Sequence, residues 1–333
     1  MHIPRLSVCS LVLLLTFGGP VFALSADEIN QAAFSADTPK DSKASKKPIA
    51  FIVKMQVLLS RRSISPGELD GRDGENYRKA VAQFRRQNNL GEGDTVDEAT
   101  WTALGGPSAG DIVTEYPLSK QDASADFART IPKDYAKQAT MKTLTYINAR
   151  EMLAERFHMS EELLVELNPR ADFDKEGELI FVTSIERKPP ETKVERIEAV
   201  KDTGMVVVYG PKDVVLASYP ATIGSDETAS PAGEHTIKRI VRNPTYHYDP
   251  EKNFQQGKNK GKLILPRGAN NPVGTVWIAL SKPTFGIHGT PEPAKVSKTS
   301  SHGCIRLTNW DAEELADMVR PGVRIRFVER SGS

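Results

Sequence analysis

The sequence predicts a multidomain fold: a small three-helix domain, a β-α-α-β unit, and a C-terminal mainly-β sandwich that carries one prominent helix. Three observations support this. The 333-residue length exceeds the usual size of one domain, about 100–200 residues. Apolar residues recur at helical spacing in the N-terminal half, whereas short runs of β-forming residues separated by Gly, Pro and Asp fill the C-terminal half. The net charge of +1, with interspersed signs, indicates no nucleic-acid partner.

Residues 1–26 have the layout of a secretory signal peptide. Arg5 gives a basic start, an apolar run covers residues 6–17, and small residues follow, so we expect cleavage at Ala23 or Ala26. The apolar run is shorter than the roughly 20 residues needed to span a bilayer. We therefore expect an exported protein of the periplasm or cell envelope, with no membrane span after cleavage.

Cleavage would leave a single cysteine. Cys9 lies in the predicted signal peptide, so Cys304 would have no partner for an intramolecular disulfide. A lone thiol in an oxidising compartment is a candidate reactive group. The alternative is a buried, inert cysteine, and the residues around Cys304 decide between the two.

Residues 27–48 are rich in Ser, Ala, Asp and Lys and predict a flexible spacer. Residues 49–107 then show helical periodicity, and Phe84 and Trp101 lie on apolar stripes that normally face a core. This unit resembles the small three-helix peptidoglycan-binding domain found beside cell-wall enzymes. The resemblance rests on Met55-Gln56-Val57-Leu58-Leu59, Leu69-Asp70-Gly71, Ala80-Val81-Ala82-Gln83-Phe84-Arg85 and Asp97-Glu98-Ala99-Thr100-Trp101.

Residues 108–139 are polar and predict a linker, and residues 140–185 predict a β-α-α-β order. Strand-like runs at 143–146 and 179–182 flank two helices that Asn148 and Ser160 can cap. This order resembles that of a LysM module, which recognises N-acetylglucosamine chains. The resemblance also rests on Phe157-His158-Met159-Ser160 and Leu167-Asn168-Pro169. The Gly-Asp-Thr turn usual at the start of that module is replaced by Asn148-Ala149-Arg150.

The C-terminal unit, residues 193–330, follows a stiff Lys-Pro-Pro linker. Its β-forming runs lie at 205–209, 214–217, 235–237 and 275–280, which favours a sandwich or barrel. One helix is expected over 311–319, capped by Thr308 or Asn309 and closed by Pro and Gly.

Two motifs in this unit carry the chemistry: Gly-Ile-His-Gly-Thr at 286–290 and Ser-His-Gly-Cys-Ile-Arg-Leu at 301–307. A thiol attacks a carbonyl as the thiolate, and the ordinary pKa of cysteine is about 8.5. A histidine within hydrogen-bond reach can take the proton. Either His302, close in sequence, or His288, brought in by the fold, could serve Cys304.

An extended backbone over 302–306 would separate the side chains into two faces. His302, Cys304 and Arg306 would face the cleft, while Ile305 and Leu307 would anchor the strand in the core.

Gly303 would let backbone N–H groups approach a substrate oxygen, as an oxyanion hole requires. Arg306 offers a planar fork for a carboxylate, or forms an ordinary surface salt bridge. A metal site of His288, His302 and Cys304 is the rival hypothesis. Structural zinc takes four ligands and no Cys-x-x-Cys or His-x-x-x-His pair is present, so we expect neither metal nor cofactor.

Taken together, the two motifs, with Arg306 and Asn309, are similar to the signature of the L,D-transpeptidase catalytic domain of the YkuD type, over about residues 193–329. The resemblance implies that Cys304 is the nucleophile and His288 its general base, oriented through the backbone of Gly289. It places His302 and Gly303 on the oxyanion side, with His302 as a possible proton donor or acceptor. The implied substrate-binding residues are Arg306, Ser301, Thr290 and Asn309.

In this family the thiol attacks the bond between diaminopimelate and the following D-alanine of a peptidoglycan tetrapeptide stem and forms a thioester. The resemblance implies a transpeptidase, in which a diaminopimelate amine makes a 3→3 crosslink or a protein amine is attached to the wall. Two alternatives stay open: an L,D-carboxypeptidase or endopeptidase that uses water, and a non-catalytic wall-binding protein. No residue in the sequence decides between amine and water, because solvent exclusion by the closed site makes that choice.

Overall fold

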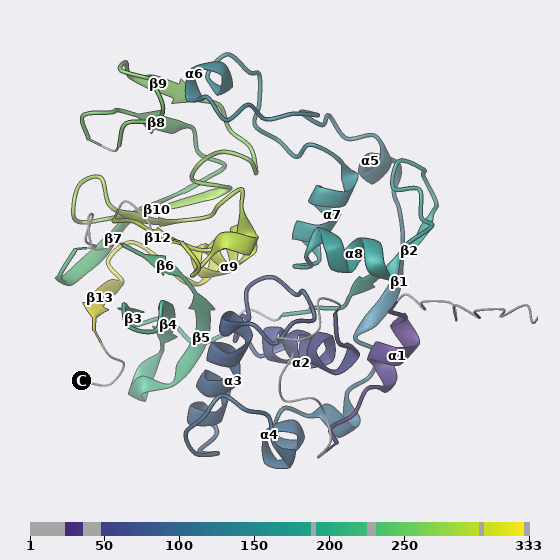
Figure 1. The fold of residues 1–333 in the computed structure, drawn as a ribbon. Helices are drawn as coiled ribbons and strands as arrows, with labels where there is room; N and C mark the ends of the chain where they lie inside the picture. Colours follow the sequence, from purple (N-terminus) through teal and green to yellow (C-terminus); the bar gives the residue numbers. More distant parts are fainter. Residues whose placement is uncertain are drawn as a thin grey trace, which may run out of the picture.

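The computed structural model describes residues 24–35, 48–187, 191–224, 231–252, 254–299 and 303–329. The predicted signal peptide up to Ala23, and Ser301 and His302, lie outside these residues. Figure 1 shows helix-rich purple and teal segments beside a β-rich part in green and yellow. No helix in the described part of the chain is long and apolar enough to cross a bilayer.

Helix α1 (Ala26–Gln31) lies where the composition predicts a flexible spacer. The Ser25 side chain accepts a hydrogen bond from the Glu28 N–H at 3.2 Å, and the Glu28 carboxylate accepts one from the Ser25 N–H at 2.8 Å. Ala26 and Ile29 are buried. This capping box and the apolar contacts order residues 26–31, so the spacer prediction is wrong for this segment.

The helices α2 (Ala50–Arg61), α3 (Glu75–Gln87) and α4 (Glu98–Ala103) follow in the predicted order. Phe84 and Trp101 are 3% and 4% exposed. Trp101 packs on Phe51 with ring centroids 5.5 Å apart. The prediction that these side chains form core is confirmed.

The small sheet of the next segment differs from the predicted order. Strand β2 (Leu179–Thr183) pairs antiparallel with β1 (Val113–Pro117), which lies in the predicted linker, and residues 143–146 form no strand. The reason is that backbone groups of this run bond the C-terminal half: the Leu144 N–H donates to the Arg267 carbonyl at 2.7 Å. The segment between the two strands contains α5 (Lys120–Ala123), α6 (Tyr135–Gln138), α7 (Ala149–Arg156) and α8 (Glu161–Leu167).

The helix caps predicted for this segment are confirmed. The Asn148 side chain accepts from the Glu151 N–H at 2.9 Å and opens α7. The Ser160 hydroxyl accepts from the Leu163 N–H at 3.0 Å and opens α8.

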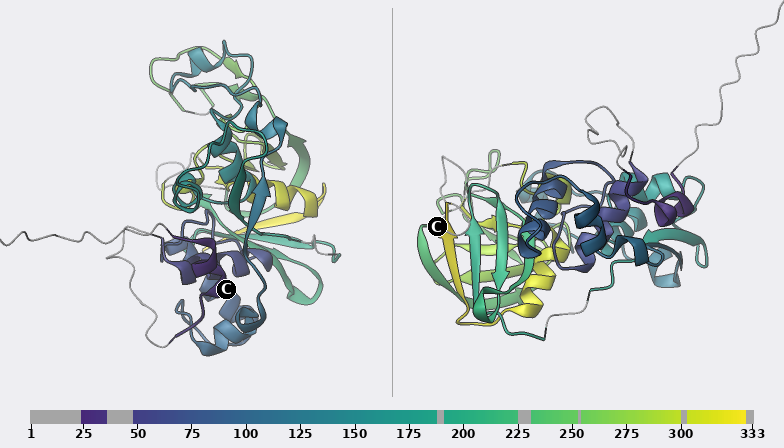
Figure 2. Two further views of the ribbon diagram at one scale, coloured as in Figure 1. Left: turned by 90° about the vertical axis from the view of Figure 1, so that its right-hand side faces the viewer. Right: turned by 90° about the horizontal axis from the view of Figure 1, so that it is seen from below.

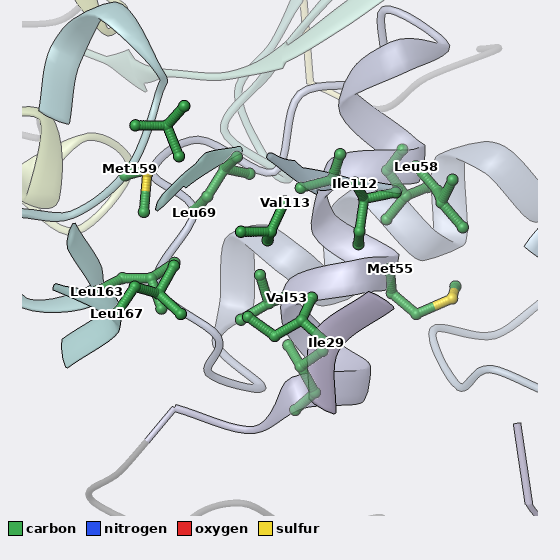
Figure 3. Packing of buried hydrophobic residues seen from close by; sticks show 14 of the residues in the cluster. Ile29, Val53, Met55, Leu58, Leu69, Ile112, Val113, Met159, Leu163 and Leu167 are labelled. Atoms are coloured by element: carbon green, nitrogen blue, oxygen red, sulfur yellow. The ribbon is translucent and has the colours of Figure 1, made fainter. Parts of the chain in front are cut away.

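The predicted helical and β-α-α-β units share one hydrophobic core. Figure 3 shows Met55 of α2, Leu69 and Met159 within one cluster that also includes Ile29 and Leu163. The Leu69 N–H donates to the His158 carbonyl at 2.8 Å, and the Ser160 N–H donates to the Leu69 carbonyl at 2.9 Å. We therefore call the described residues up to 187 the N-terminal body, and those from 191 the C-terminal body.

In the described C-terminal body, nine strands form one sheet in the order β5-β4-β3-β13-β7-β10-β11-β12-β6. Strand β7 joins its two halves, because it pairs with β13 on one side and with β10 on the other. A separate hairpin consists of β8 and β9. The bounds are β3 (Arg196–Val200), β4 (Met205–Tyr209), β5 (Val215–Pro220), β6 (Thr222–Ile223), β7 (Gly233–Arg242), β8 (Tyr246–Tyr248), β9 (Leu263–Leu265), β10 (Val276–Leu280), β11 (Gly286–His288), β12 (Ile305–Arg306) and β13 (Arg324–Val328).

Helix α9 (Asn309–Met318) completes this body, and Thr308 is its cap. Apolar side chains from both halves of the sheet meet those of α9 in one core, for example Val208, Ile278 and Leu315. The predicted mainly-β C-terminal unit with a prominent helix is confirmed.

The two bodies contact each other at several places, two of which lie at opposite ends of the junction. Near α9, residues 63–65 run along strand β5: the Ser65 N–H donates to the Ser218 carbonyl at 2.8 Å and the Ser218 N–H to the Ser63 carbonyl at 2.9 Å. At the other end, α6 lies beside β9, as Figures 1 and 2 show. The N-terminal body thus reaches over the hairpin of the C-terminal body.

Candidate active site

Strands β11 and β12 are parallel neighbours, and they bring the two motifs together. Their register pairs Ile287 with Ile305 and His288 with Arg306. Both isoleucines are fully buried in the core, so alternation places His288 and Arg306 on the opposite face. Cys304 directly precedes β12 and is partly exposed. The predicted alternation is confirmed for Ile305 and Arg306, but the extended backbone predicted over 302–306 is interrupted by a bend at residues 303–304, where Gly303 has φ 97°.

His288 is held by the residue that follows it. Its Nδ1 lies 2.7 Å from the Gly289 carbonyl oxygen, and Trp277 stacks on its ring at 5.6 Å and 19°. Because a carbonyl only accepts, Nδ1 carries the hydrogen and Nε2 keeps a free lone pair. Burial, followed by the charge of Arg306, lowers the pKa of His288 to about 4 although the Gly289 bond acts against this. The imidazole is neutral near pH 7, as a base must be.

Cys304 lies immediately before strand β12, and its Sγ is 3.7 Å from the Thr284 carbonyl oxygen. Burial raises the pKa of this thiol, while a backbone hydrogen bond from Gly286 and the charge of Arg306 lower it. The resting group is a thiol, and the last two contacts favour the thiolate once a base has removed the proton.

Gly303 has φ 97°, in the region that favours glycine over residues with a Cβ. A bare backbone at this position suits the predicted oxyanion hole. His302 and Ser301, the other predicted residues of this loop, lie outside the described residues, so their roles stay predictions.

Arg306 lies near both Cys304 and the loop that carries Glu292 and Thr299. Its Nη1 is 3.4 Å from the Thr299 hydroxyl. Burial lowers the pKa of Arg306, and Glu292, Tyr135 and Cys304 act in the opposite direction. A guanidinium remains charged under such shifts, so it supplies a fixed positive charge beside Cys304.

Two predicted substrate contacts are instead buried. Thr290 is 3% exposed and its hydroxyl accepts from the Glu292 N–H at 3.2 Å. Asn309 is 2% exposed, its Nδ2 donates to the Ala269 carbonyl at 3.2 Å, and its Oδ1 accepts from the Thr275 N–H at 3.2 Å. Both side chains bond protein groups inside the fold, and their contact with substrate stays a prediction.

A cleft of about 530 Å³ adjoins the site through Thr284 and Trp277, which contact Cys304 and His288 respectively. Its lining includes the cations Arg239, Lys252 and Arg267. Its carboxylate, Asp249, is paired with Lys262 at 3.2 Å and with Lys252 at 3.9 Å, which leaves Arg239 and Arg267 as the cations in excess. The cleft therefore suits an anionic ligand, and sequence reasoning did not identify it, since these cations are spread over separate loops and strands.

The N-terminal body supplies an aromatic wall next to the site. Tyr135 of α6 packs edge-on against Tyr246 at 6.0 Å and Tyr248 at 5.4 Å. Burial raises the pKa of Tyr135 to about 12, and the charge of Arg306 opposes this rise. Burial raises the pKa of Tyr246, and a negative charge on Cys304 would raise it further. No local pattern in the sequence distinguished Tyr135 from Tyr116 and Phe127, the other aromatic residues of the polar stretch 108–139.

Within the ranges that the structure describes, no three His, Cys, Asp or Glu side chains are grouped as metal ligands. His302, one member of the rival metal hypothesis, is not among those residues.

Comparison with known proteins gives a consistent result. The family described as the L,D-transpeptidase catalytic domain, YkuD, matches residues 195–326. The Bacillus licheniformis protein YkuD, named as an L,D-transpeptidase, is 30% identical over 177 residues, which cover 53% of this chain and 90% of that protein. Its Bacillus subtilis counterpart is 29% identical over 174 residues, or 52% and 89%.

Among solved structures, L,D-transpeptidase 3 from Mycobacterium tuberculosis, in complex with a faropenem-derived adduct, is similar over 45% of this chain and 67% of that chain, with 18% identity and a TM-score of 0.34. The family match lies within the C-terminal body and leaves the N-terminal body outside it.

Proposed function

Because the chain belongs to the L,D-transpeptidase family of the YkuD type, we propose that it is an exported acyltransferase that uses Cys304 on peptidoglycan tetrapeptide stems. The observation that carries this proposal is the pairing of β11 with β12, which sets His288 and Arg306 side by side on the face away from the core. No cofactor is needed for thiol-dependent acyl transfer.

In the first half-reaction, His288 Nε2 takes the proton of the Cys304 thiol. The thiolate attacks the carbonyl carbon of the bond between diaminopimelate and D-alanine, and the backbone amides at Gly303 and Cys304 stabilise the oxyanion. His302, on the same loop, assists there. The imidazolium returns its proton to the leaving nitrogen, so that D-alanine departs and a thioester remains. The neutral, Gly289-oriented imidazole supports the role of His288.

In the second half-reaction, an amine attacks the thioester, the thiol leaves, and a new amide forms. The acceptor is the side-chain amine of another diaminopimelate, which gives a 3→3 crosslink, or an amine of an envelope protein. Tyr135 and Tyr246 beside the site support an amine over water as the acceptor, because aromatic rings limit the access of solvent.

The charge of the cleft supports the donor assignment. Peptide stems carry carboxylates, and Arg239, Arg267 and Arg306 supply positive charge in and beside the cleft. Bidentate arginine contacts would orient the stem. The resemblances in the N-terminal body support a second part of the proposal, that this body retains the enzyme on wall polymer in the periplasm.

The test is mass spectrometry of disaccharide-tetrapeptide fragments incubated with the mature chain and with Cys304→Ala. A Cys304-dependent loss of D-alanine together with a crosslinked dimer supports the transpeptidase. A Cys304-dependent tripeptide without dimer moves the function to a carboxypeptidase. Intact fragments, also after an envelope protein with free amines has been added, would contradict the catalytic proposal and favour a wall-binding protein.

A further inference from the structure

The N-terminal body reaches the neighbourhood of the catalytic base through one buried carboxyl group. Glu155 on α7 is 8% exposed, and α7 lies against α9. Its two carboxyl oxygens accept hydrogen bonds from Asn309 Nδ2 at 3.2 and 2.9 Å, across 154 positions of sequence. The Tyr146 hydroxyl approaches the same group at 3.4 Å. The Asn309 amide is therefore held from both bodies: Glu155 shares its Nδ2 with the Ala269 carbonyl, and its Oδ1 accepts from the Thr275 N–H.

The other end of the Asn309 amide lies against the backbone that carries the base. A Cβ placed on Gly289 would be 2.2 Å from Asn309 Oδ1, and one on Gly274 would be 2.0 Å from it. These glycines therefore lie in direct contact with the amide oxygen. Gly289 is also the residue whose carbonyl holds His288 Nδ1 at 2.7 Å. Gly289 is thus the one residue that lies between the Asn309 amide and the His288 ring.

We propose that Glu155 is a positioning residue for His288, acting through Asn309 and the Gly289 backbone, so that docking of the N-terminal body completes the catalytic geometry. This inference rests on the proposed function for its assignment of His288 as the base. It adds a requirement for a residue that the catalytic family match, residues 195–326, does not contain.

The surroundings of Glu155 explain why such a carboxyl group is stable there. Burial raises the pKa of Glu155 to about 8, Asn309 and Tyr146 oppose this through hydrogen bonds, and the carboxylates of Glu151 and Glu313 reinforce it. A carboxyl group that is protonated near neutral pH still offers an acceptor oxygen to Asn309 without placing a bare charge in the junction.

The experiment compares three variants of the mature chain. Glu155→Met removes the acceptor at similar bulk, and Glu155→Gln keeps an acceptor oxygen. Glu151→Met is the matched control: Glu151 lies one turn away on α7, and its carboxylate accepts from Asn270 Nδ2 at 2.9 Å and from the Ile147 N–H, so it serves the junction through partners other than Asn309. If Glu155→Met does not fold, Glu155→Ala replaces it.

Two readouts separate positioning from simple docking. The first is kcat and KM for dimer formation from tetrapeptide fragments. The second is the pH profile of Cys304 alkylation by iodoacetamide, which reports the thiolate and its base without any peptide substrate. If the wild-type chain shows no acyl transfer, the proposed function is contradicted. The alkylation profiles would still test the role of Glu155 in that case.

We expect Glu155→Met to lower kcat on the order of tenfold to a hundredfold, the cost of a misplaced reacting group, with KM nearly unchanged. The alkylation midpoint should move to higher pH. Glu155→Gln and Glu151→Met should stay close to wild type in both readouts. The inference is overturned if Glu155→Met matches wild type, or if Glu155→Met and Glu151→Met lose activity equally with unchanged alkylation profiles.

Discussion

Gly289→Ala tests whether the Gly289 carbonyl orients His288, the proposed catalytic base. The new Cβ would lie 2.2 Å from Asn309 Oδ1 and 3.2 Å from Asn309 Cα, whereas ordinary contact begins near 3.4 Å. Because Asn309 is buried and bonded at both ends, the backbone at 289 must move by about 1 Å. Such a shift breaks the 2.7 Å contact with His288 Nδ1.

A displacement of about 1 Å can reduce a rate on the order of a hundredfold, which equals about 2.7 kcal/mol of transition-state stabilisation. The assay is kcat for tetrapeptide turnover, with the thermal midpoint of each variant as a check of folding. Gly261→Ala is the matched control, because a Cβ there meets no atom within 4 Å. A folded Gly289→Ala enzyme with wild-type kcat would refute the assignment of Gly289.

Three further predictions concern the junction and the N-terminal end. Tyr135→Ala should raise KM several-fold and lower the thermal midpoint, since each lost aromatic pair is worth about 0.5–1.5 kcal/mol, while Tyr135→Phe keeps the ring and should behave as wild type in the same kinetic assay. Burial raises the pKa of Asp311 to about 7. The contribution of this carboxyl group to stability is therefore present below its unfolded pKa near 3.8 and is lost as the pH rises through about 7. Between pH 5 and 9 the thermal midpoint should fall less in Asp311→Asn than in wild type, and an equal fall in both would contradict this. Cleavage of the predicted signal peptide should follow Ala23, because cleavage after Ala26 would remove the Ser25 cap and a buried residue of α1. Mass spectrometry of the exported protein should find Leu24 as its first residue, and a protein that begins at Asp27 would contradict the prediction.

The sequence was sufficient for features that depend on neighbouring residues. The apolar periodicity around Phe84 and the caps Asn148 and Ser160 predicted helices that the structure contains. Helix periodicity and capping act over a few positions, so the local sequence records them. The motifs around His288 and Cys304 likewise indicated the family, because this chemistry requires particular residue types at close spacing.

Other features depended on contacts between distant segments, and only the tertiary structure decided them. Strand β2 takes β1 as its partner, not residues 143–146, because the backbone at Leu144 bonds Arg267 in the other body. Asn309 takes Glu155 of the other body as a hydrogen-bond partner, which the motif alone does not indicate. Tyr135 reaches the site from a polar segment. Strand pairing and the partners of buried polar groups are set by the packing of whole units, and a single sequence does not record which units will meet.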